Sequence, residues 1–353
     1  MKALLLSGGT GSRLRPLTYT CPKQLIPVAN KPVLYRALEA IGAGGIADVA
    51  VVVGEAAPAV MASVGDGSRW GLRVTYLRQD APRGLAHAVA IAEEFLAADP
   101  FVLFLGDTLL KDGIGAAVTR FQATRPDALV VVGRAEDPGR FGVVEVKGGR
   151  VHRLEEKPRT PRSDLVLVGV YVFGPRVFDA VRAIRPSARG ELEITDAIQQ
   201  MADWGCTVDA HQVAGWWKDI GTPEDLLDAN RLLLEDVETE LRGLAEESWI
   251  AGPVRLGAGT VVRRSTVRGP AVIGEGCHIE DAHVGPFTSV GDRCTLRRVQ
   301  IENSIVLEGC VLDRVAFPVV SSVLGRETVI GCGGTPSRGL GLVVGDRSRI
   351  CPV

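Results

Sequence analysis

Short apolar runs alternate with amphipathic stretches over the first 215 residues or so of the chain. Apolar runs that suit buried strands lie at residues 3–6, 49–53, 74–77, 101–105 and 129–132. Between them, residues 32–41 and 85–96 have the apolar spacing of helices that bury one face. This alternation is typical of an α/β domain with a mainly parallel sheet. Later runs at 143–146, 151–154 and 166–173 indicate strands that make the sheet mixed.

A helix with well-defined start signals follows this region. Thr222 supplies a capping side chain, Pro223 suits the first helical position, and Glu224 and Asp225 lie near the positive end of the helix dipole. We predict that the helix links two domains. Its expected apolar face consists of leucines, at Leu226, Leu227, Leu233, Leu234, Leu241 and Leu244.

After residue 249 the pattern changes to short units punctuated by glycine. Branched apolar residues recur at intervals of six in three successive registers: Val261, Val267, Ile273 and Ile279; Val284, Val290 and Leu296; Val299, Ile305 and Val311. A six-residue repeat predicts a parallel β-helix, in which each unit forms one side of a triangular coil and turns its branched residue inward. A β-sandwich would instead show alternation at period two. Residues 318–353 have weaker periodicity and are not assigned.

The sequence therefore predicts two domains. Residues 1–240 are expected to form a Rossmann-like α/β domain with a mixed, mainly parallel sheet, and residues 241–353 a left-handed, hexapeptide-repeat β-helix.

Charge and cysteine content restrict the partners and the cellular compartment that the sequence supports. The 40 basic and 42 acidic side chains nearly balance, which gives no support to nucleic acid or an anionic membrane as the main partner. The first strand follows the start at once and no apolar run could cross a bilayer, so we expect a cytoplasmic protein. The seven cysteines form no Cys-x-x-Cys pair, and we interpret them as reduced, mostly buried thiols.

A glycine-rich loop follows the first apolar run and is the strongest motif. A Walker loop is excluded because no lysine stands at the required place after Gly11, and a dinucleotide fingerprint is excluded because Leu14 occupies the third glycine position. What remains is a loop whose N–H groups can face a nucleotide, with Arg13 and Lys23 available to phosphate oxygens. The alternative is an ordinary glycine-rich turn with solvated basic residues.

Carboxylates occupy two further positions of interest. Asp107 follows the run at 101–105 and so lies at the carboxyl end of a strand, where open α/β sheets bind ligands. Asp219 comes just before the linking helix. Both suit a divalent cation, although an aspartate in such a place is often only a turn former or a helix cap.

Four other motifs complete the pattern. They are Gln79 to Ala86, Phe141 to Glu145, the sequence Glu-Glu-Lys-Pro at 155–158, and residues 189–196. In this order the motifs resemble the sugar-1-phosphate nucleotidylyltransferases, most closely the long-form glucose-1-phosphate thymidylyltransferases, which carry an added C-terminal domain. The resemblance covers essentially the entire chain.

This resemblance implies an enzyme that transfers a thymidylyl group from dTTP to glucose 1-phosphate, with Mg²⁺ bound to Asp107 and Asp219. The products would be dTDP-glucose, which supplies activated deoxysugars, and pyrophosphate. It assigns catalysis to Arg13, Lys23, Asp107 and Lys157, and sugar-phosphate binding to Gly142, Glu156, Lys157 and Val168. It assigns nucleotide binding to Leu6, Gly8, Gly9, Thr10, Gly11, Ser12, Arg13, Gln79 and Gly84. Phe141 stands where many relatives have tyrosine.

Several functional alternatives stay open at this level. Uracil differs from thymine by one methyl group, so UTP or another sugar phosphate could be the substrate. Six-residue β-helices also serve acyltransferases, and His278 and His283 lie in this region. A regulatory subunit without activity is a further possibility, although the retained basic and acidic residues argue against it. We expect a homo-oligomer, whose symmetry one chain does not reveal.

Overall fold

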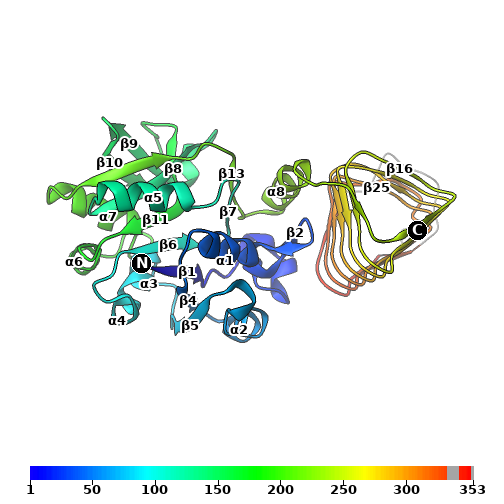
Figure 1. The fold of residues 1–353 in the computed structure, drawn as a ribbon, viewed down its shortest axis with the longest axis horizontal. Helices are drawn as coiled ribbons and strands as arrows, with labels where there is room; N and C mark the ends of the chain where they lie inside the picture. Colours follow the sequence, from blue (N-terminus) through cyan, green and yellow to red (C-terminus); the bar gives the residue numbers. More distant parts are fainter. Residues whose placement is uncertain (332–341, 351–353) are drawn as a thin grey trace. The chain divides into compact units, whose positions relative to one another are not determined.

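The protein divides into two compact units (Figure 1). The computed structural model describes residues 1–331 and 342–350. Unit 1 comprises Met1–Thr10 and Val33–Asp219, and unit 2 comprises Gly11–Pro32 and Ile220–Val353. The segment 11–32, which carries Arg13 and Lys23, thus belongs with the C-terminal part of the chain rather than with the sheet that precedes it.

Unit 1 is built on a nine-stranded sheet in the order β5-β4-β1-β6-β11-β8-β12-β10-β9. The strands are β1 (Lys2–Ser7), β4 (Asp48–Val53), β5 (Arg73–Arg78), β6 (Phe101–Leu105), β8 (Ala128–Arg134), β9 (Gly142–Lys147), β10 (Arg150–Glu156), β11 (Leu165–Phe173) and β12 (Val208–Gln212). Strands β5, β4, β1 and β6 pair in parallel, whereas β11 is antiparallel to both β6 and β8. The predicted mixed sheet is confirmed.

Helices connect these strands. They are α1 (Val33–Ala43), α2 (Ala57–Val64), α3 (Leu85–Ile91), α4 (Glu93–Leu96), α5 (Gly115–Thr124), α6 (Val177–Ala183) and α7 (Ile194–Asp203), with the 3₁₀ turns η4 (Ser68–Trp70) and η5 (Pro138–Arg140). The expectation of one helix over 85–96 is wrong, because the chain tightens at Ala92, whose N–H bonds to the Val89 carbonyl. The buried face still runs through Val89, Ala92 and Leu96.

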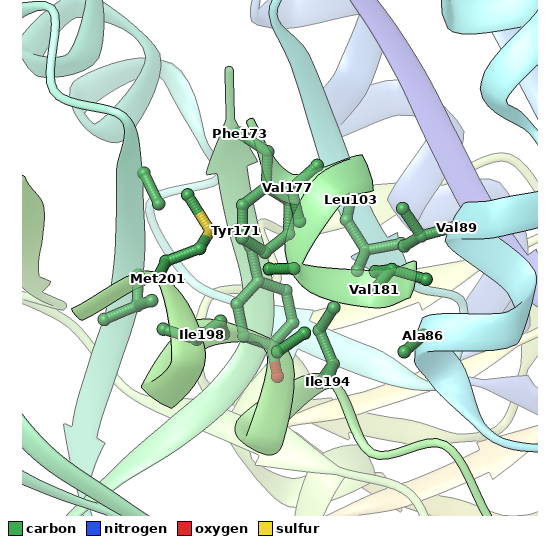
Figure 2. Close-up of a cluster of buried hydrophobic side chains, with 14 of the residues drawn as sticks. Ala86, Val89, Leu103, Tyr171, Phe173, Val177, Val181, Ile194, Ile198 and Met201 are labelled. Carbon is green, nitrogen blue, oxygen red and sulfur yellow. The ribbon is translucent and has the colours of Figure 1, made fainter. Parts of the chain in front are cut away.

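A cluster of buried hydrophobic side chains, most of them aliphatic, forms the core of unit 1 (Figure 2). Tyr171 and Phe173 project from the same face of β11, and their rings stack with centroids 5.7 Å apart. Ile198 and Met201 of α7 and Val177 of α6 surround them. Burial raises the pKa of the Tyr171 hydroxyl, and the charge of a nearby glutamate raises it further. The core therefore anchors α6 and α7 on the sheet.

Unit 2 begins, after the segment 11–32, with helix α8 (Pro223–Glu235). Thr222 and Asp225 form a capping box, as the start signals indicate. The predicted apolar face is wrong at its far end, because the helix stops at Glu235. Leu241 and Leu244 instead lie in the first strands of the next domain, where each side chain is 51% exposed.

The rest of unit 2 coils through three parallel sheets, an arrangement consistent with the predicted left-handed β-helix; Figure 1 shows its triangular section. Within the described residues the first sheet holds β14 (Glu240–Leu241), β17 (Val254–Leu256), β20 (Ala271–Ile273), β23 (Thr288–Val290), β26 (Ile305–Val306), β29 (Val323–Leu324) and β31 (Val343–Val344). The second holds β15 (Leu244–Glu246), β18 (Val261–Arg263), β21 (His278–Glu280), β24 (Thr295–Arg297), β27 (Val311–Asp313), β30 (Val329–Gly331) and β32 (Arg349–Ile350). The third holds β16 (Trp249–Ala251), β19 (Thr266–Arg268), β22 (His283–Val284), β25 (Gln300–Glu302) and β28 (Val319–Val320).

The pairing explains the shifts between the six-residue registers. Val254 pairs with Ala271, and Ala271 pairs with Thr288, so each of these coils contains 17 residues. Three sides of six residues would need 18, so one side of each coil has only five. The inward residues are consequently Val262, Val306 and Leu312. The expectation that Val261, Ile305 and Val311 point inward is wrong, and each inward residue is the next one along the chain.

One corner of the coil carries a ladder of alternating charge. Glu246, Arg263, Glu280, Arg297 and Asp313 occupy the same position in successive coils. Nitrogen and oxygen atoms lie 2.6 Å apart in the Arg263–Glu246 pair and 3.6 Å apart in the Arg297–Glu280 pair. Exposed ion pairs contribute little individually, but a pairing shifted by one coil would set like charges opposite each other. The ladder therefore favours the observed register.

The first sheet also has a buried outer face. Val272, Ile305 and Val323 are almost wholly buried, although their neighbours in sequence face the coil interior. Helix α8 contacts β23 on this sheet, and a Cβ on Gly345 would lie 3.3 Å from Pro16. Helix α8 and the segment 11–32, both parts of unit 2, therefore cover the outer face of this sheet.

The remaining expectations concern membranes and cysteines. No helix within residues 1–331 and 342–350 is long and apolar enough to cross a membrane. The five described cysteines are buried and free, in line with reduced thiols. Cys332 and Cys351 lie outside the described residues, as do residues 332–341 and 351–353 of the unassigned stretch 318–353.

A matched pair of valines tests the corrected register. Val262→Thr keeps the side-chain volume but buries a hydroxyl in the coil interior, and should lower the free energy of unfolding by about 1–3 kcal/mol. Val261→Thr places the same hydroxyl on the outside and should change it by less than ~0.5 kcal/mol. Urea unfolding of both variants measures the difference, and equal losses would contradict the assignment.

Candidate active site

The first half of the glycine-rich loop follows the end of strand β1 and belongs to unit 1. Backbone pairing aligns Ser7 with Val53 of β4, and Gly54 lies close against Gly8. Strand β5 is the next neighbour, and Gln79 follows it directly. A Cβ on Gly8 would lie 3.4 Å from Oε1 of Gln79. The structure therefore brings the predicted loop together with Gln79, another of the predicted nucleotide-binding residues.

Hydrogen bonds fix the orientation of the Gln79 amide. Its Nε2 donates to the Gly84 carbonyl at 3.2 Å and lies 3.0 Å from Nδ1 of His87. A carbonyl can only accept, so the amide nitrogen must face Gly84 and the oxygen must face Gly8. The sequence analysis did not assign His87. Its place one helical turn after Gly84 is the only signal that could have found it.

Only a glycine fits at position 84. Its φ is 100° and its ψ is 171°, a backbone region that is essentially limited to glycine. A Cβ there would overlap the backbone of Leu192, which accepts a hydrogen bond from the Ala86 N–H at the start of α3. This glycine thus lets the loop before α3 approach the motif 189–196.

The two predicted metal ligands lie at a pair of strands, where Asp107 directly precedes β7 (Thr108–Leu110) and Asp219 ends β13 (Trp217–Asp219). Strand β7 pairs antiparallel with β13, and the pairing sets Asp219 opposite Thr108. Asp107 is therefore next to the residue that Asp219 pairs with. Two carboxylates at adjacent backbone positions suit a divalent cation that takes its other oxygen ligands from phosphates. Within the described part of the chain no group of three or more His, Cys, Asp or Glu side chains forms a cation site.

Thr108, the residue after Asp107, is buried against Gly169 of β11. It is 2% exposed, and a Cβ on Gly169 would lie 2.6 Å from its Oγ1. Gly169 follows the predicted sugar-binding residue Val168, which is itself buried in β11.

Three of the four predicted sugar-phosphate residues (Gly142, Glu156 and Lys157) gather with Thr195 where β9 and β10 meet. Gly142 pairs with Glu156, and a Cβ on Gly142 would lie 2.7 Å from Cγ2 of Thr195. The Thr195 hydroxyl donates to Oε2 of Glu156 at 3.1 Å. Lys157 has a φ of 43°, unusual for a side chain of its size, and its Nζ lies 3.6 Å from Oε1 of Glu156. The structure brings these four residues together.

Arg189 joins this group, although the sequence analysis gave it no role. Its guanidinium donates to Oε1 of Glu156 at 3.3 Å and also contacts Glu191 and Glu193. Burial raises the pKa of the Glu193 carboxyl against the opposing hydrogen bond from Ser187. Arg189 is therefore shared among three carboxylates and holds positive charge beside Glu156.

Phe141 and Trp217 pack together next to Gly142. Their rings meet edge to face with centroids 5.3 Å apart. The indole Nε1 donates to the Arg134 carbonyl at 3.3 Å, and Gly133 has no room for a Cβ beneath it. Phe141 thus makes an aromatic contact with Trp217 and brings no hydroxyl to this position.

The second half of the loop lies in unit 2. Gly11 has a φ of 63°, and a Cβ there would lie 3.0 Å from Cβ of Lys23. The Thr18 hydroxyl donates to the Gly11 carbonyl at 2.8 Å. Arg13 is exposed, and a Cβ on Gly221 would lie 3.0 Å from its Nη2. Three 3₁₀ turns shape this segment: η1 (Ser12–Leu14), η2 (Leu17–Tyr19) and η3 (Lys23–Leu25).

The predicted residues therefore fall into two groups. Unit 1 holds Leu6, Gly8, Gly9, Thr10, Gln79, Gly84, Asp107, Gly142, Glu156, Lys157, Val168 and Asp219, and unit 2 holds Gly11, Ser12, Arg13 and Lys23. Leu6 packs in the core, and its carbonyl accepts from the Gly106 N–H.

A family model described as nucleotidyl transferase matches residues 2–236 of the chain. The chain belongs to this family. The match covers the whole of unit 1, the segment 11–32 and helix α8, which together contain all the site residues above.

Curated relatives extend the similarity to the β-helix. The chain is 48% identical over 351 residues to a glucose-1-phosphate thymidylyltransferase of Streptomyces griseus, covering 99% of each chain. It is 46% identical over 353 residues to one of Streptomyces antibioticus, again with 99% coverage of both. A UTP–glucose-1-phosphate uridylyltransferase of Haloferax volcanii is 37% identical over 239 residues, covering 67% of this chain and 98% of that protein.

A solved structure supports the fold of the N-terminal part. It is a Bacillus anthracis protein, provisionally assigned as a glucose-1-phosphate thymidylyltransferase, in complex with a sucrose. It is 35% identical, has a TM-score of 0.63, and covers 68% of this chain and 98% of its own.

Two glycines test the close approach at Gly84. Gly84→Ala should lower the free energy of unfolding by about 3 kcal/mol, because it combines a forbidden backbone region with backbone overlap. Gly190→Ala also has a positive φ but has open space around it, so it should cost only ~1 kcal/mol. Thermal unfolding compares the two, and a Gly84→Ala variant no less stable than the control would refute the argument.

Proposed function

We propose that this chain transfers a thymidylyl group from dTTP to glucose 1-phosphate and so forms dTDP-glucose and pyrophosphate. The observation that carries the proposal is its near full-length identity to two thymidylyltransferases, one of 48% and one of 46%. No covalent intermediate on the protein is needed, because the sugar phosphate can attack the α-phosphorus directly. The chain must then bind two anionic substrates and stabilise the charge that develops on the leaving group.

Gln79 is the proposed reader of the base. Its amide nitrogen is engaged by Gly84 and His87, which leaves Oε1 as an acceptor toward Gly8. Such an acceptor fits the N3–H of thymine or uracil, whereas cytosine offers no proton at that ring position. The hydrogen-bond network around this one amide would therefore favour thymine or uracil over cytosine.

Asp107 and Asp219 are the proposed ligands of a divalent cation, and we propose Mg²⁺ because carboxylate and phosphate oxygens are its preferred ligands. A cation bound there would neutralise phosphate charge during transfer. Arg13 and Lys23 would bind the departing pyrophosphate. Lys157 would hold the phosphate of the attacking sugar, while Glu156, oriented by Thr195 and Arg189, would accept hydrogen bonds from its hydroxyls.

The proposed cation site predicts that loss of one aspartate weakens metal binding and lowers turnover. Asp107→Asn removes one anionic ligand and should lower turnover by ~100-fold or more. Titration calorimetry with Mg²⁺ and a non-hydrolysable dTTP analogue should show weaker metal binding in this variant. Asp112→Asn, an exposed aspartate nearby, is the control and should behave as the parent protein does. Unchanged metal affinity in Asp107→Asn would remove Asp107 from the site.

The proposed role of Lys157 predicts that its loss raises KM for one substrate only, glucose 1-phosphate. Lys157→Ala should raise KM for glucose 1-phosphate by about 10-fold to 100-fold, as expected for a lost hydrogen bond to a charged group. It should also lower kcat, because the attacking phosphate is held less firmly, and should leave KM for dTTP nearly unchanged. Lys147→Ala, an exposed lysine at the far end of β9, serves as the control. Equal changes in both KM values would contradict the assignment.

The nucleotide remains the main choice to test. The similarity to a uridylyltransferase of Haloferax volcanii favours UTP as the second candidate. Pyrophosphate release should be measured for dTTP, UTP, GTP, CTP and ATP against a panel of sugar 1-phosphates with Mg²⁺. We expect highest kcat/KM with dTTP and glucose 1-phosphate. A preference for a purine triphosphate would overturn both the function and the role of Gln79.

We further infer the setting in which the enzyme works. Nucleoside triphosphates and sugar phosphates are metabolites of the cell interior, which supports a cytoplasmic enzyme. The first coil of the β-helix exposes Leu241, Leu244 and Trp249, which supports a homo-oligomer. We retain 1–240 and 241–353 as the functional domains. Light scattering of the purified chain would measure its mass in solution.

A further inference from the structure

The segment that carries Lys23 ends in a tight hairpin. Strands β2 (Pro27–Val28) and β3 (Lys31–Pro32) pair so that Val28 lies opposite Lys31, which leaves a two-residue turn. Both turn residues have left-handed backbones, with φ of 46° at Ala29 and 59° at Asn30. Alanine adopts this region only at a cost, so the surroundings must stabilise the turn.

A buried asparagine of helix α8 holds this turn. Asn230 is fully buried, and its Oδ1 accepts from the Ala29 N–H at 2.9 Å and from the Ser289 hydroxyl at 2.9 Å. Its Nδ2 donates to the Phe287 carbonyl at 2.9 Å. One side chain thus joins the hairpin, helix α8 and strand β23 of the β-helix. Because it is buried, a loss of these bonds would leave polar atoms without partners.

Two further bonds attach the same segment to the β-helix directly. Nδ2 of Asn30 donates to the Val290 carbonyl at 2.6 Å. The Thr20 hydroxyl donates to Oδ2 of Asp346 at 2.8 Å. The segment 11–32 is therefore attached to the β-helix on both sides of Lys23, near its middle and at its end.

Lys23 is tied closely to these attachments. Between it and β2 lie Leu25 and Ile26, both of which are buried, so a shift of the hairpin is not absorbed by a loose connection. We propose that the β-helix is a positioning element for the reaction: through Asn230, Ser289 and the Ala29–Asn30 turn it sets the place of Lys23. This inference rests on the proposed function, in which Lys23 binds the pyrophosphate group.

The turn offers a mild test. Asn30→Gly keeps a residue that adopts positive φ readily and removes only the bond to Val290. In the reverse reaction, from dTDP-glucose and pyrophosphate, KM for pyrophosphate should rise by about fivefold to thirtyfold, the usual effect of losing one buried interaction. KM for dTDP-glucose should stay within about twofold, because the sugar and base contacts lie in unit 1. Amide hydrogen exchange over residues 23–31 should become faster.

A matched control lies elsewhere in the β-helix. Asn303 also has a positive φ, of 45°, and its Nδ2 bonds to Ser321 of the next coil at 3.0 Å. Asn303→Gly therefore also removes one asparagine side-chain bond at a positive-φ position, without touching the segment 11–32. It should leave KM for pyrophosphate and exchange over 23–31 unchanged. Equal effects of Asn30→Gly and Asn303→Gly would reveal general destabilisation and overturn the proposal.

Asn230 provides a second, independent variant pair. Asn230→Ala removes all three bonds and should raise KM for pyrophosphate at least as much as Asn30→Gly. Asn230→Asp keeps the acceptor for Ala29 and Ser289 and should recover part of the loss. If Asn230→Ala destabilises the fold too far for kinetics, the Asn30→Gly and Asn303→Gly comparison decides alone.

Lys23→Ala separates this inference from the proposed function. A normal KM for pyrophosphate in Lys23→Ala would show that the proposed role of Lys23 is wrong. A raised KM in Lys23→Ala, with parental kinetics and exchange in Asn30→Gly, would leave that role intact and refute positioning by the β-helix.

Discussion

The parallel pairing of β1 with β4 on one side and β6 on the other is the constraint on which the candidate site in unit 1 depends. Pairing aligns Leu6 with Leu105 and Ser7 with Val53, so the carboxyl ends of these strands meet at one edge of the sheet. Gly8 follows the end of β1 directly, and Asp107 follows the end of β6 after Gly106. A slip of one residue in either pairing would move a loop and turn buried side chains to the other face.

Close backbone approach then gives the site its shape. Gly84 lies against Leu192, Gly133 under Trp217, Gly142 against Thr195 and Gly169 against Thr108, and none has room for a Cβ. These contacts join elements that are far apart in sequence. They also fix the orientation of the polar side chains that lie between those elements. Gln79 shows the consequence, because its amide orientation follows from the Gly84 carbonyl beside it. Rigid packing of this kind reduces the entropy lost on binding.

The β-helix obeys a different constraint, which is stacking in register. Its interior tolerates sides of five or six residues, as long as each inward residue stacks on its counterpart in the next coil. The charge ladder from Glu246 to Asp313 adds specificity rather than much stability. The outer face of one sheet is apolar and covered, and through it the β-helix holds the segment that contains Lys23.

The sequence by itself determined the alternation of strands and helices, the change to a coiled repeat, and the residue types that suit a nucleotide, a cation and a sugar phosphate. Local patterns carry this information, because buried strands need apolar runs and ligands need particular donors and acceptors. The phase of the repeat was beyond the sequence: 261–262, 305–306 and 311–312 are apolar pairs, and only stacking decides which member faces inward. Tertiary structure also decided that Arg189 contacts Glu156 and that the segment 11–32 packs with the β-helix. Both depend on contacts between residues far apart in the chain, which no local pattern specifies.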